Sequence, residues 1–363
     1  MNKYADASSQ QIEIAVQSSW QAFLQYRKKN LKERANFLRA IASGLQNNSS
    51  AIIETAMQET NLEEARLKTE FRRTIFQLTS YAQACEEGTW LDIRINTVSD
   101  QSQASKVDLR KMLIPLGPVV VFGASNFPFA YSTAGGDTAC ALAAGCPVII
   151  KVHPAHAGTS ELVYAVIKNA ANQCNLPEGI FHHLHGASFE VGKALVLHRL
   201  VKAVGFTGSF VGGKALFDWA NARAVPIPVF AEMSSVNPVF LLAQKQEKDT
   251  EKIALMYADS ITQSVGQFCT NPGLIIGVKS DSLEKFIDLL GEGIKKIRPA
   301  KMLHTGIAKS FYKNRAEALE QAHVSLAAQT SFDAAEDEGM PTIATTTGAA
   351  FLSNPVLHKA VRL

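Results

Sequence analysis

The residue best suited to covalent chemistry in this sequence is Cys269. It lies in a short stretch that follows a predicted helix and is flanked by Gly266 and Pro272, so its thiol is presented on a loop of restricted conformation. A nucleophile needs such presentation, whereas a cysteine that only packs in a core does not. The remaining cysteines occur in predicted helices or at their ends beside alanines, where packing is the expected role. They are Cys85, Cys140, Cys146 and Cys174.

Two polar residues that follow predicted strands could assist this nucleophile. Glu232 comes directly after the strand 228–231 with no other charged residue beside it, a setting that suits a general base. Asn126 follows the strand 119–122 and precedes Phe127 and Pro128, so a rigid turn could aim its amide at a developing oxyanion. Taken singly, an ordinary loop glutamate and an ordinary turn asparagine are the simpler interpretations.

An anion could bind where two other predicted strands end. Lys151 closes one of them, and its ammonium could hold ribose hydroxyls or a phosphate. The segment 205–213 is rich in glycine where a strand passes into a helix, an arrangement that suits a phosphate. It lacks the GxGxxG order of the common dinucleotide fingerprint, so we do not expect a standard Rossmann site. An exposed lysine and a simple glycine-rich turn are the alternatives.

Histidines recur at 153–156 and 182–185 and raise the question of a metal site. No acidic or thiol partner lies at ligand spacing from these histidines in the sequence. We therefore predict no metal site and expect these histidines to be exposed or internally hydrogen-bonded.

Periodic patterns indicate the elements that must position these groups. Apolar residues at three- and four-residue spacing predict helices at 11–26, 31–47, 50–60 and 62–86. Period-two alternation between 91 and 112 predicts a projecting hairpin that needs a surface to lie against. Strands and helices then alternate, which is typical of βαβ units around a parallel sheet. Strands are expected at 119–122, 148–152, 180–184, 203–206, 229–231, 239–242 and 274–278. Helices are expected at 132–144, 160–172, 189–197, 211–221, 251–264 and 282–297.

Composition excludes several classes of protein. A chain of 363 residues that is 47% hydrophobic and 19% charged predicts a soluble globular protein. The formal charge of +3 offers no basis for binding nucleic acid or an anionic membrane. The uncharged stretch 112–136 is long enough to span a bilayer, but its prolines and glycines favour a strand and turn. An odd number of scattered cysteines and an N-terminus without an apolar signal region favour the cytoplasm.

Taken together, the chemical segments resemble the aldehyde dehydrogenase family. Asn126 with its Phe-Pro pair, Lys151, a Phe-Thr-Gly-Ser segment that ends at Ser209, Glu232 and Cys269 occur in the order and approximate spacing of that family. The resemblance extends over nearly the whole chain. It implies that Cys269 adds to an aldehyde, that Asn126 and the Cys269 amide hold the oxyanion, and that Glu232 activates the water that hydrolyses the thioester.

The same resemblance implies an α/β fold of the aldehyde dehydrogenase type with four parts. Residues 1–90 are expected to be the N-terminal helical part of the cofactor domain and 91–112 an oligomerisation hairpin. Residues 113–243 are expected to form a Rossmann-like NAD(P)-binding domain around a parallel sheet, and 244–363 an incomplete α/β catalytic domain. The expected partners are a small aldehyde and further copies of the chain, with no nucleic acid and no membrane.

Cofactor contacts are implied for five positions. Lys151 is expected at the adenosine ribose or its 2′-phosphate, and Gly205, Ser209 and Gly212 near the pyrophosphate. His156 stands where many members of the family have a glutamate that binds both ribose hydroxyls. Because losing that carboxylate removes repulsion against a 2′-phosphate, NADP is expected to be preferred, with NAD possible.

Within the family, the segments 153–156, 232–238 and 268–273 resemble the branch that oxidises 2,5-dioxopentanoate, with fatty or other aldehydes as the alternative. The family's Glu-x-Phe-Gly-Pro motif does not follow the segment 351–355, so the chain is expected to be C-terminally truncated. An inactive remnant or a non-catalytic subunit is therefore a second hypothesis. A CoA-acylating enzyme is a third, and Glu232 argues against it because such an enzyme needs no water-activating base.

Overall fold

The computed structural model describes residues 4–97 and 108–360, and it divides into two compact units. The larger unit contains the described residues up to Glu59 and those from Glu63 to Glu232, and the smaller unit contains Thr60–Leu62 and the described residues from Met233 onward. The division after Glu232 precedes the expected boundary at 243. It does so because the strand that follows Met233 pairs within the smaller unit and adds nothing to the sheet of the larger one.

Four helices form the N-terminal part of the larger unit, close to their predicted positions. They are α1 (Ser9–Tyr26), α2 (Leu31–Asn47), α3 (Ser49–Thr60) and α4 (Glu64–Glu87). Ser8 and Asn30 each close a capping box, which satisfies the first free amides of α1 and α2. Gly88 ends α4 in the left-handed conformation at φ 65°, where a side chain would be strained.

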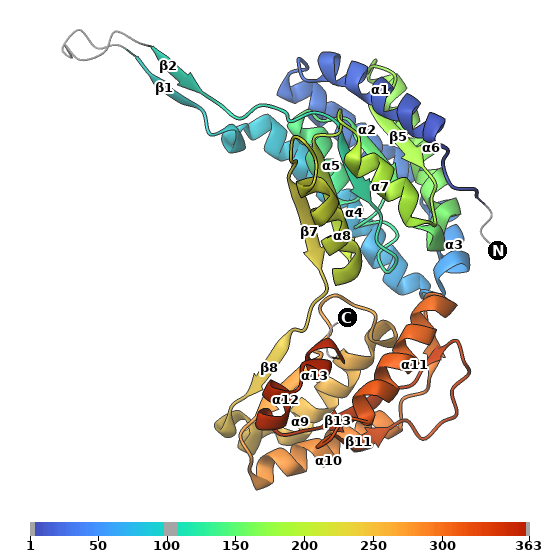
Figure 1. Ribbon diagram of the computed structural model, residues 1–363, viewed down its shortest axis with the longest axis vertical. Helices are drawn as coiled ribbons and strands as arrows, with labels where there is room; N and C mark the ends of the chain where they lie inside the picture. Colours follow the sequence, from blue (N-terminus) through green and yellow to red (C-terminus); the bar gives the residue numbers. More distant parts are fainter. Residues whose placement is uncertain (1–3, 98–107, 361–363) are drawn as a thin grey trace. The chain divides into compact units, whose positions relative to one another are not determined.

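The centre of the larger unit is a five-stranded sheet of order β5-β4-β3-β6-β7, of which Figure 1 labels the two edge strands, β5 and β7. Its strands are β3 (Val119–Phe122), β4 (Val148–Lys151), β5 (Phe181–Leu184), β6 (Ala203–Gly208) and β7 (Val229–Met233). The strands β3, β4, β5 and β6 run parallel, and Phe122 lies level with Lys151 on one side and Phe206 on the other. The carboxyl ends of these strands therefore meet at one edge of the sheet.

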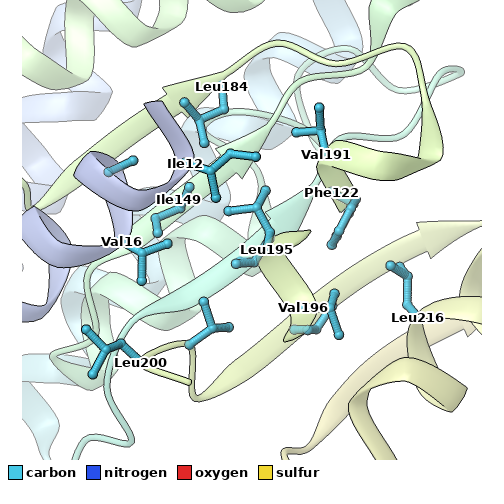
Figure 2. Packing of buried hydrophobic residues seen from close by; sticks show 14 of the residues in the cluster. Ile12, Val16, Phe122, Ile149, Leu184, Val191, Leu195, Val196, Leu200 and Leu216 are labelled. Atoms are coloured by element: carbon cyan, nitrogen blue, oxygen red, sulfur yellow. The ribbon is translucent and has the colours of Figure 1, made fainter. Parts of the chain in front are cut away.

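Helices follow the strands and bury the sheet. They are α5 (Gly136–Ala144), α6 (Ala157–Gln173), α7 (Phe189–Leu197) and α8 (Phe210–Asn221). On one face, Ile12 and Val16 of α1 pack with Leu195 of α7 and Ile149 of β4 (Figure 2). All four residues of β3 are buried, as expected for a parallel strand with both faces covered. The helix predicted from 132 begins only at Gly136, because 132–135 form a turn in which the Gly135 amide bonds to the Ser132 carbonyl.

The predicted hairpin is an antiparallel pair of β1 (Arg94–Asn96) and β2 (Leu109–Lys111) (Figure 1). All six strand residues are exposed, including the apolar side chains of Ile95 and Leu109. The residues that join the two strands lie outside the described part of the chain.

The smaller unit is built on the parallel pair β8 (Pro238–Leu241) and β9 (Leu274–Gly277), packed with α9 (Ala243–Thr262) and α10 (Asp281–Lys295). Its core contains Leu241, Ala254, Phe286 and Leu290. Further elements that the periodicity did not predict are β10 (Ala300–Lys301), α11 (Thr305–Leu319), β11 (Ser325–Gln329), β12 (Glu338–Gly339), β13 (Thr342–Thr345), α12 (Gly348–Ser353) and α13 (Pro355–Ala360).

The stretch 112–136 contains β3 and the turns around it. Within the described residues, none of the helices has the length and apolar character that crossing a membrane requires.

Candidate active site

Several of the predicted site residues gather at the carboxyl edge of the sheet in the larger unit. Asn126 follows β3, Lys151 is the last residue of β4, Ser209 follows β6, and Glu232 is near the end of β7. Because β3, β4 and β6 share one register, their ends bring Asn126, Lys151 and Ser209 to the same edge, and β7 pairs next to β6. Ligands of open α/β sheets bind at this edge.

The turn that carries Asn126 is anchored by α4. The guanidinium of Arg66 donates from Nη2 to the Asn126 carbonyl at 2.5 Å and lies over the Phe127 ring at 5.0 Å. One helical turn later, Oε1 of the buried Glu70 accepts the amides of Phe129 and Ala130 at 2.8 and 3.0 Å. Burial raises the pKa of Glu70 to about 7, against the lowering effect of the two amides. The main chain on both sides of the Phe-Pro pair is thus held from a neighbouring helix.

Lys151 lies partly buried, and burial lowers its pKa while the carboxylate of Asp6 opposes that change. Asp6 itself accepts the amides of Ala187 and Ser188 at 2.7 and 3.2 Å, at the start of α7. A hydrogen bond from the Ser188 side chain, and then those from the two amides, lower the pKa of Asp6, so it is a negative charge that acts on Lys151. A desolvated ammonium at a strand end suits a ribose or a phosphate.

In the glycine-rich turn between β6 and α8, Ser209 is the predicted residue that can contact a phosphate. Ser209 is the exposed N-cap of α8, and its Oγ accepts the Gly212 amide at 3.1 Å. The hydroxyl of Ser209 retains a proton that it can donate to a ligand, whereas the Gly212 amide is already used by the cap. A side chain at position 208 is disfavoured, since a Cβ there would lie only 2.8 Å from Phe206 Cζ.

Gly205 and His156 are placed differently from the other predicted cofactor residues. Gly205 is buried, and a Cβ there would lie 3.2 Å from Oδ2 of Asp137, the second residue of α5. His156 is completely buried, and its Nε2 lies 2.7 Å from the Ala124 carbonyl. Neither residue presents a surface to a ligand in this structure. Their effect on the site is through packing of α5 and of the loop after β3.

Glu232 is exposed on β7. Its carboxylate acts on Asp137, whose pKa is raised by burial and then by the charge of Glu232. An exposed carboxylate can exchange protons with solvent, as a base that activates water must.

Cys269 lies in the smaller unit, on a loop whose backbone is unusually constrained. The helical turn η3 (Gln263–Gly266) precedes it, and Ser264, Val265 and Gly266 there adopt φ values of 49°, 60° and 73°. A β-branched residue such as Val265 is rarely found in the left-handed region, and strain of this kind costs about 1–3 kcal/mol. Strained backbone of this kind clusters at functional sites, which supports the choice of Cys269.

Polar side chains hold this loop in place. The Cys269 carbonyl accepts a hydrogen bond from Ser235 Oγ and another from Asn237 Nδ2, the latter at 2.7 Å. Asn237 Nδ2 also bonds to the Asn271 carbonyl at 2.9 Å, and Asn271 Nδ2 donates to Gly266 at 2.8 Å. The carbonyl of Cys269 is therefore fixed by two side chains, and its thiol is half-buried.

Sequence reasoning missed Arg66, Glu70, Asp137, Asn237 and Asn271. Arg66 and Glu70 lie four residues apart in α4, which was predicted only as a helix. A pair of opposite charges near the apolar face of that helix is the sequence signal that could have singled them out. Asn237 and Asn271 each precede a proline after a strand or a cysteine loop, and they were treated only as parts of motifs. Asn126, Lys151, Ser209 and Glu232 share the larger unit, and Cys269 belongs to the smaller one.

The chain is similar in sequence to known dehydrogenases that act on aldehydes. Over 315 residues the chain is 45% identical to alpha-ketoglutaric semialdehyde dehydrogenase 2 of Azospirillum brasilense, which covers 86% of this chain and 60% of that protein. It is 43% identical over 309 residues to alpha-ketoglutaric semialdehyde dehydrogenase of Acinetobacter baylyi (strain ATCC 33305 / BD413 / ADP1), covering 85% and 58%. The matched region thus spans about 60% of the length of these relatives.

Solved structures show the same fold. An NAD-dependent benzaldehyde dehydrogenase from Corynebacterium glutamicum superimposes with a TM-score of 0.78 at 19% identity, over 96% of this chain and 74% of that one. A 1-pyrroline-5-carboxylate dehydrogenase gives 0.82 at 17% identity, over 96% and 67%. The family model described as "Aldehyde dehydrogenase family" matches residues 1–328. Because the family model matches that much of the sequence, this chain belongs to the aldehyde dehydrogenase family.

Proposed function

We propose that this chain catalyses, or forms the nucleophile-bearing part of an enzyme that catalyses, the NAD(P)-dependent oxidation of 2,5-dioxopentanoate to 2-oxoglutarate. The observation that carries the proposal is the loop of Cys269, whose carbonyl is fixed by Ser235 and Asn237 after three residues in the left-handed region. The substrate is proposed from the names of the two relatives at 43–45% identity. Because the match spans about 60% of their length, the activity of a complete enzyme is part of the proposal.

The proposed reaction begins at the Cys269 thiolate, which adds to the aldehyde carbon and forms a thiohemiacetal. The oxyanion that develops is stabilised by the side-chain amide of Asn126 and by the main-chain N–H of Cys269. Arg66 and Glu70 serve this step as positioning residues, since they hold the main chain around Asn126. Loss of hydride from the same carbon leaves a thioester on Cys269.

Glu232 is proposed to complete the cycle as general base. Its exposed carboxylate takes a proton from water, which attacks the thioester carbonyl while the carbon–sulfur bond breaks. The carboxylic acid leaves and the Cys269 thiolate is restored. The neighbouring Asp137, with its raised pKa, is a nearby group that can share the proton taken up by Glu232.

NAD(P), when bound, supplies the acceptor for the hydride. Lys151 is proposed to bind the adenosine ribose or a 2′-phosphate on it, and Ser209 to donate its hydroxyl proton to the pyrophosphate. Gly212 supports this contact by donating its amide N–H to Ser209 Oγ, and Gly205 and His156 support it by packing. NADP is proposed as the preferred form, because no carboxylate stands at position 156 to repel the extra phosphate.

Assembly and location are further parts of the proposal. The exposed apolar side chains of Ile95 and Leu109 on the hairpin favour pairing with a second copy of the chain. The five cysteines are free thiols, which favours the reducing cytoplasm.

The test is aldehyde-dependent reduction of NADP by the purified chain, followed by the absorbance of the reduced nicotinamide. Cys269→Ser should abolish turnover, and Cys140→Ser, which alters another accessible thiol, should leave it unchanged. Glu232→Gln should give one rapid equivalent of reduced cofactor and then stop, because the thioester no longer hydrolyses. Equal turnover by Cys269→Ser, or no aldehyde-dependent reduction and no acyl adduct on Cys269 in folded protein, would overturn the proposal.

A further inference from the structure

Three side chains with metal-binding groups, none of which is used in the proposed reaction, converge in the larger unit. Glu161 lies in the first turns of α6, His183 is in β5, and His185 follows that strand directly. Although Glu161 and His185 are 24 residues apart in the sequence, their side chains are in contact. We predicted no metal site because no acidic residue lies at ligand spacing from these histidines in the sequence. The fold, however, places the carboxylate of Glu161 beside them.

The spacing of the three groups suits a single ion. His185 Nε2 lies 2.6 Å and His183 Nδ1 lies 3.7 Å from the same Glu161 oxygen, Oε1. One ligand atom from each residue can be chosen so that all three lie within 4.8 Å of one another. Around a tetrahedral zinc ion with bonds of about 2.0–2.2 Å, ligand atoms are roughly 3.3 Å apart. The two measured separations lie on either side of that value, so small side-chain movements would make room for the ion.

The neighbours of His183 orient its free nitrogen toward this point. Its Nε2 is hydrogen-bonded to Ser160 Oγ at 2.9 Å, which turns Nδ1 toward Glu161. Ser160 Oγ is in turn hydrogen-bonded to Thr133 Oγ1. The Tyr164 ring stacks on His183 with centroids 5.0 Å apart. A second hydrogen bond that fixes the ring and leaves the other nitrogen free is typical of histidine ligands.

The position of His185 is also restricted by its neighbours. The Tyr4 ring stacks on it at 4.2 Å with planes 5° apart, and its carbonyl accepts the Ala7 amide at 2.9 Å. All three candidate ligands are half-buried, which limits competition from water without closing the site. An ion held here would connect α6 and β5 to the segment that carries Tyr4.

We propose that Glu161, His183 and His185 form a structural binding site for a divalent transition-metal ion of the Zn²⁺ type, with water as the fourth ligand. Two imidazoles and one carboxylate are borderline ligands that suit zinc and cobalt and suit calcium or magnesium poorly. The alternative is a plain histidine–carboxylate contact with no ion. His198 and Glu13 provide that arrangement elsewhere in this chain, with Nε2 and Oε2 3.1 Å apart.

The experiment is a titration of the EDTA-treated full chain with Zn²⁺ by calorimetry and with Co²⁺ by visible absorption. We expect one equivalent to bind, Co²⁺ to give bands of a four-coordinate site without thiolate charge-transfer absorption, and the ion to raise the melting temperature. Two single variants remove one ligand each, and Glu161→Gln also keeps the size of the side chain. Each of Glu161→Gln and His185→Gln should weaken Zn²⁺ binding by at least about tenfold. The matched control is His198→Gln, which should bind as the unaltered chain does.

Circular dichroism of the metal-free variants shows whether they remain folded. The proposal fails if the folded Glu161→Gln and His185→Gln chains bind Zn²⁺ as tightly as the His198→Gln control. It also fails if no equivalent binds at all, or if the cobalt spectrum shows thiolate ligands. None of these readouts depends on oxidation of an aldehyde.

Discussion

The guanidinium of Arg66 donates to the main-chain carbonyl of Asn126 at 2.5 Å, so a helix in the N-terminal part of the chain holds the turn that carries the proposed oxyanion amide. Glu70, one turn further along α4, binds the same turn through the amides of Phe129 and Ala130. Positioning of a reactive group by a buried neighbour is worth much of an enzyme's rate, because small displacements of a hydrogen-bond donor weaken its effect on the transition state.

Replacing Arg66 by lysine should slow formation of the thioester on the order of tenfold, because the planar contact with Phe127 and the hydrogen bond to Asn126 are both lost. The measurement is the rate of the first equivalent of reduced cofactor under single-turnover conditions. Arg72→Lys is the control, since Arg72 is exposed and donates to Thr69 in its own helix. In an Asn126→Ala background the Arg66 change should have little further effect, and additive losses would contradict the positioning role.

Glu70→Gln should change how stability depends on pH. The folded pKa of Glu70, about 7, is above its ordinary value of 4.5, so its contribution to stability is complete below pH 4.5 and is lost as pH rises through 7. The loss is about 3 kcal/mol for a shift of this size. Both amides bond to Oε1, so glutamine keeps these acceptor contacts and mimics the protonated acid. Urea unfolding at pH 5 and pH 8 should show the variant gaining stability relative to the unaltered chain at the higher pH, and a constant difference would refute the assignment.

Gly339→Ala should disturb the loop of Cys269. A Cβ at position 339 would overlap Val265 Cγ1, and Val265 is one of the strained residues of η3. Overpacking of this kind typically costs about 1–3 kcal/mol. We expect a lower melting temperature for the smaller unit and a changed rate of Cys269 alkylation, measured by mass spectrometry of its peptide. The matched control is Gly348→Ala, where a Cβ has no neighbour within 4 Å. Equal behaviour of the two variants would show that Val265 yields without moving the loop.

Asp6→Asn should strengthen the binding of NADP several-fold and leave the binding of NAD nearly unchanged. The carboxylate of Asp6 acts on Lys151, and removing its charge leaves the ammonium free to attract a 2′-phosphate. Asparagine keeps an oxygen to accept the Ala187 amide, so the N-terminal segment should remain in place. Fluorescence titration with both nucleotides measures the effect, and higher salt should reduce it. Glu13→Gln, which removes an exposed charge from α1, is the control. An equal gain in NADP binding by this control, or an equal gain in NAD binding by Asp6→Asn, would count against a local interaction at Lys151.

Much of the fold could be predicted because its signals are local. The helices α1 to α4 have apolar residues at helical spacing, Ser8 and Asn30 cap the first two, and the strands of the parallel sheet are short apolar runs. The short strands β10 to β13 escaped prediction because two to five residues carry too little periodic information. Cys269, Asn126 and Glu232 were likewise predicted to be chemical groups from their residue types and their order along the chain, and that assignment stays a prediction.

Tertiary structure alone decided which groups meet. It buried His156 and Gly205, which the sequence placed at a ligand, and it brought Glu161 to two histidines that seemed to lack an acidic partner. It also joined Arg66 to Asn126, 60 residues away. The physical reason is that residue type and spacing determine which elements form and which groups they carry. Contacts between distant residues instead depend on how those elements pack, and no local pattern records the side chain that will arrive from another element.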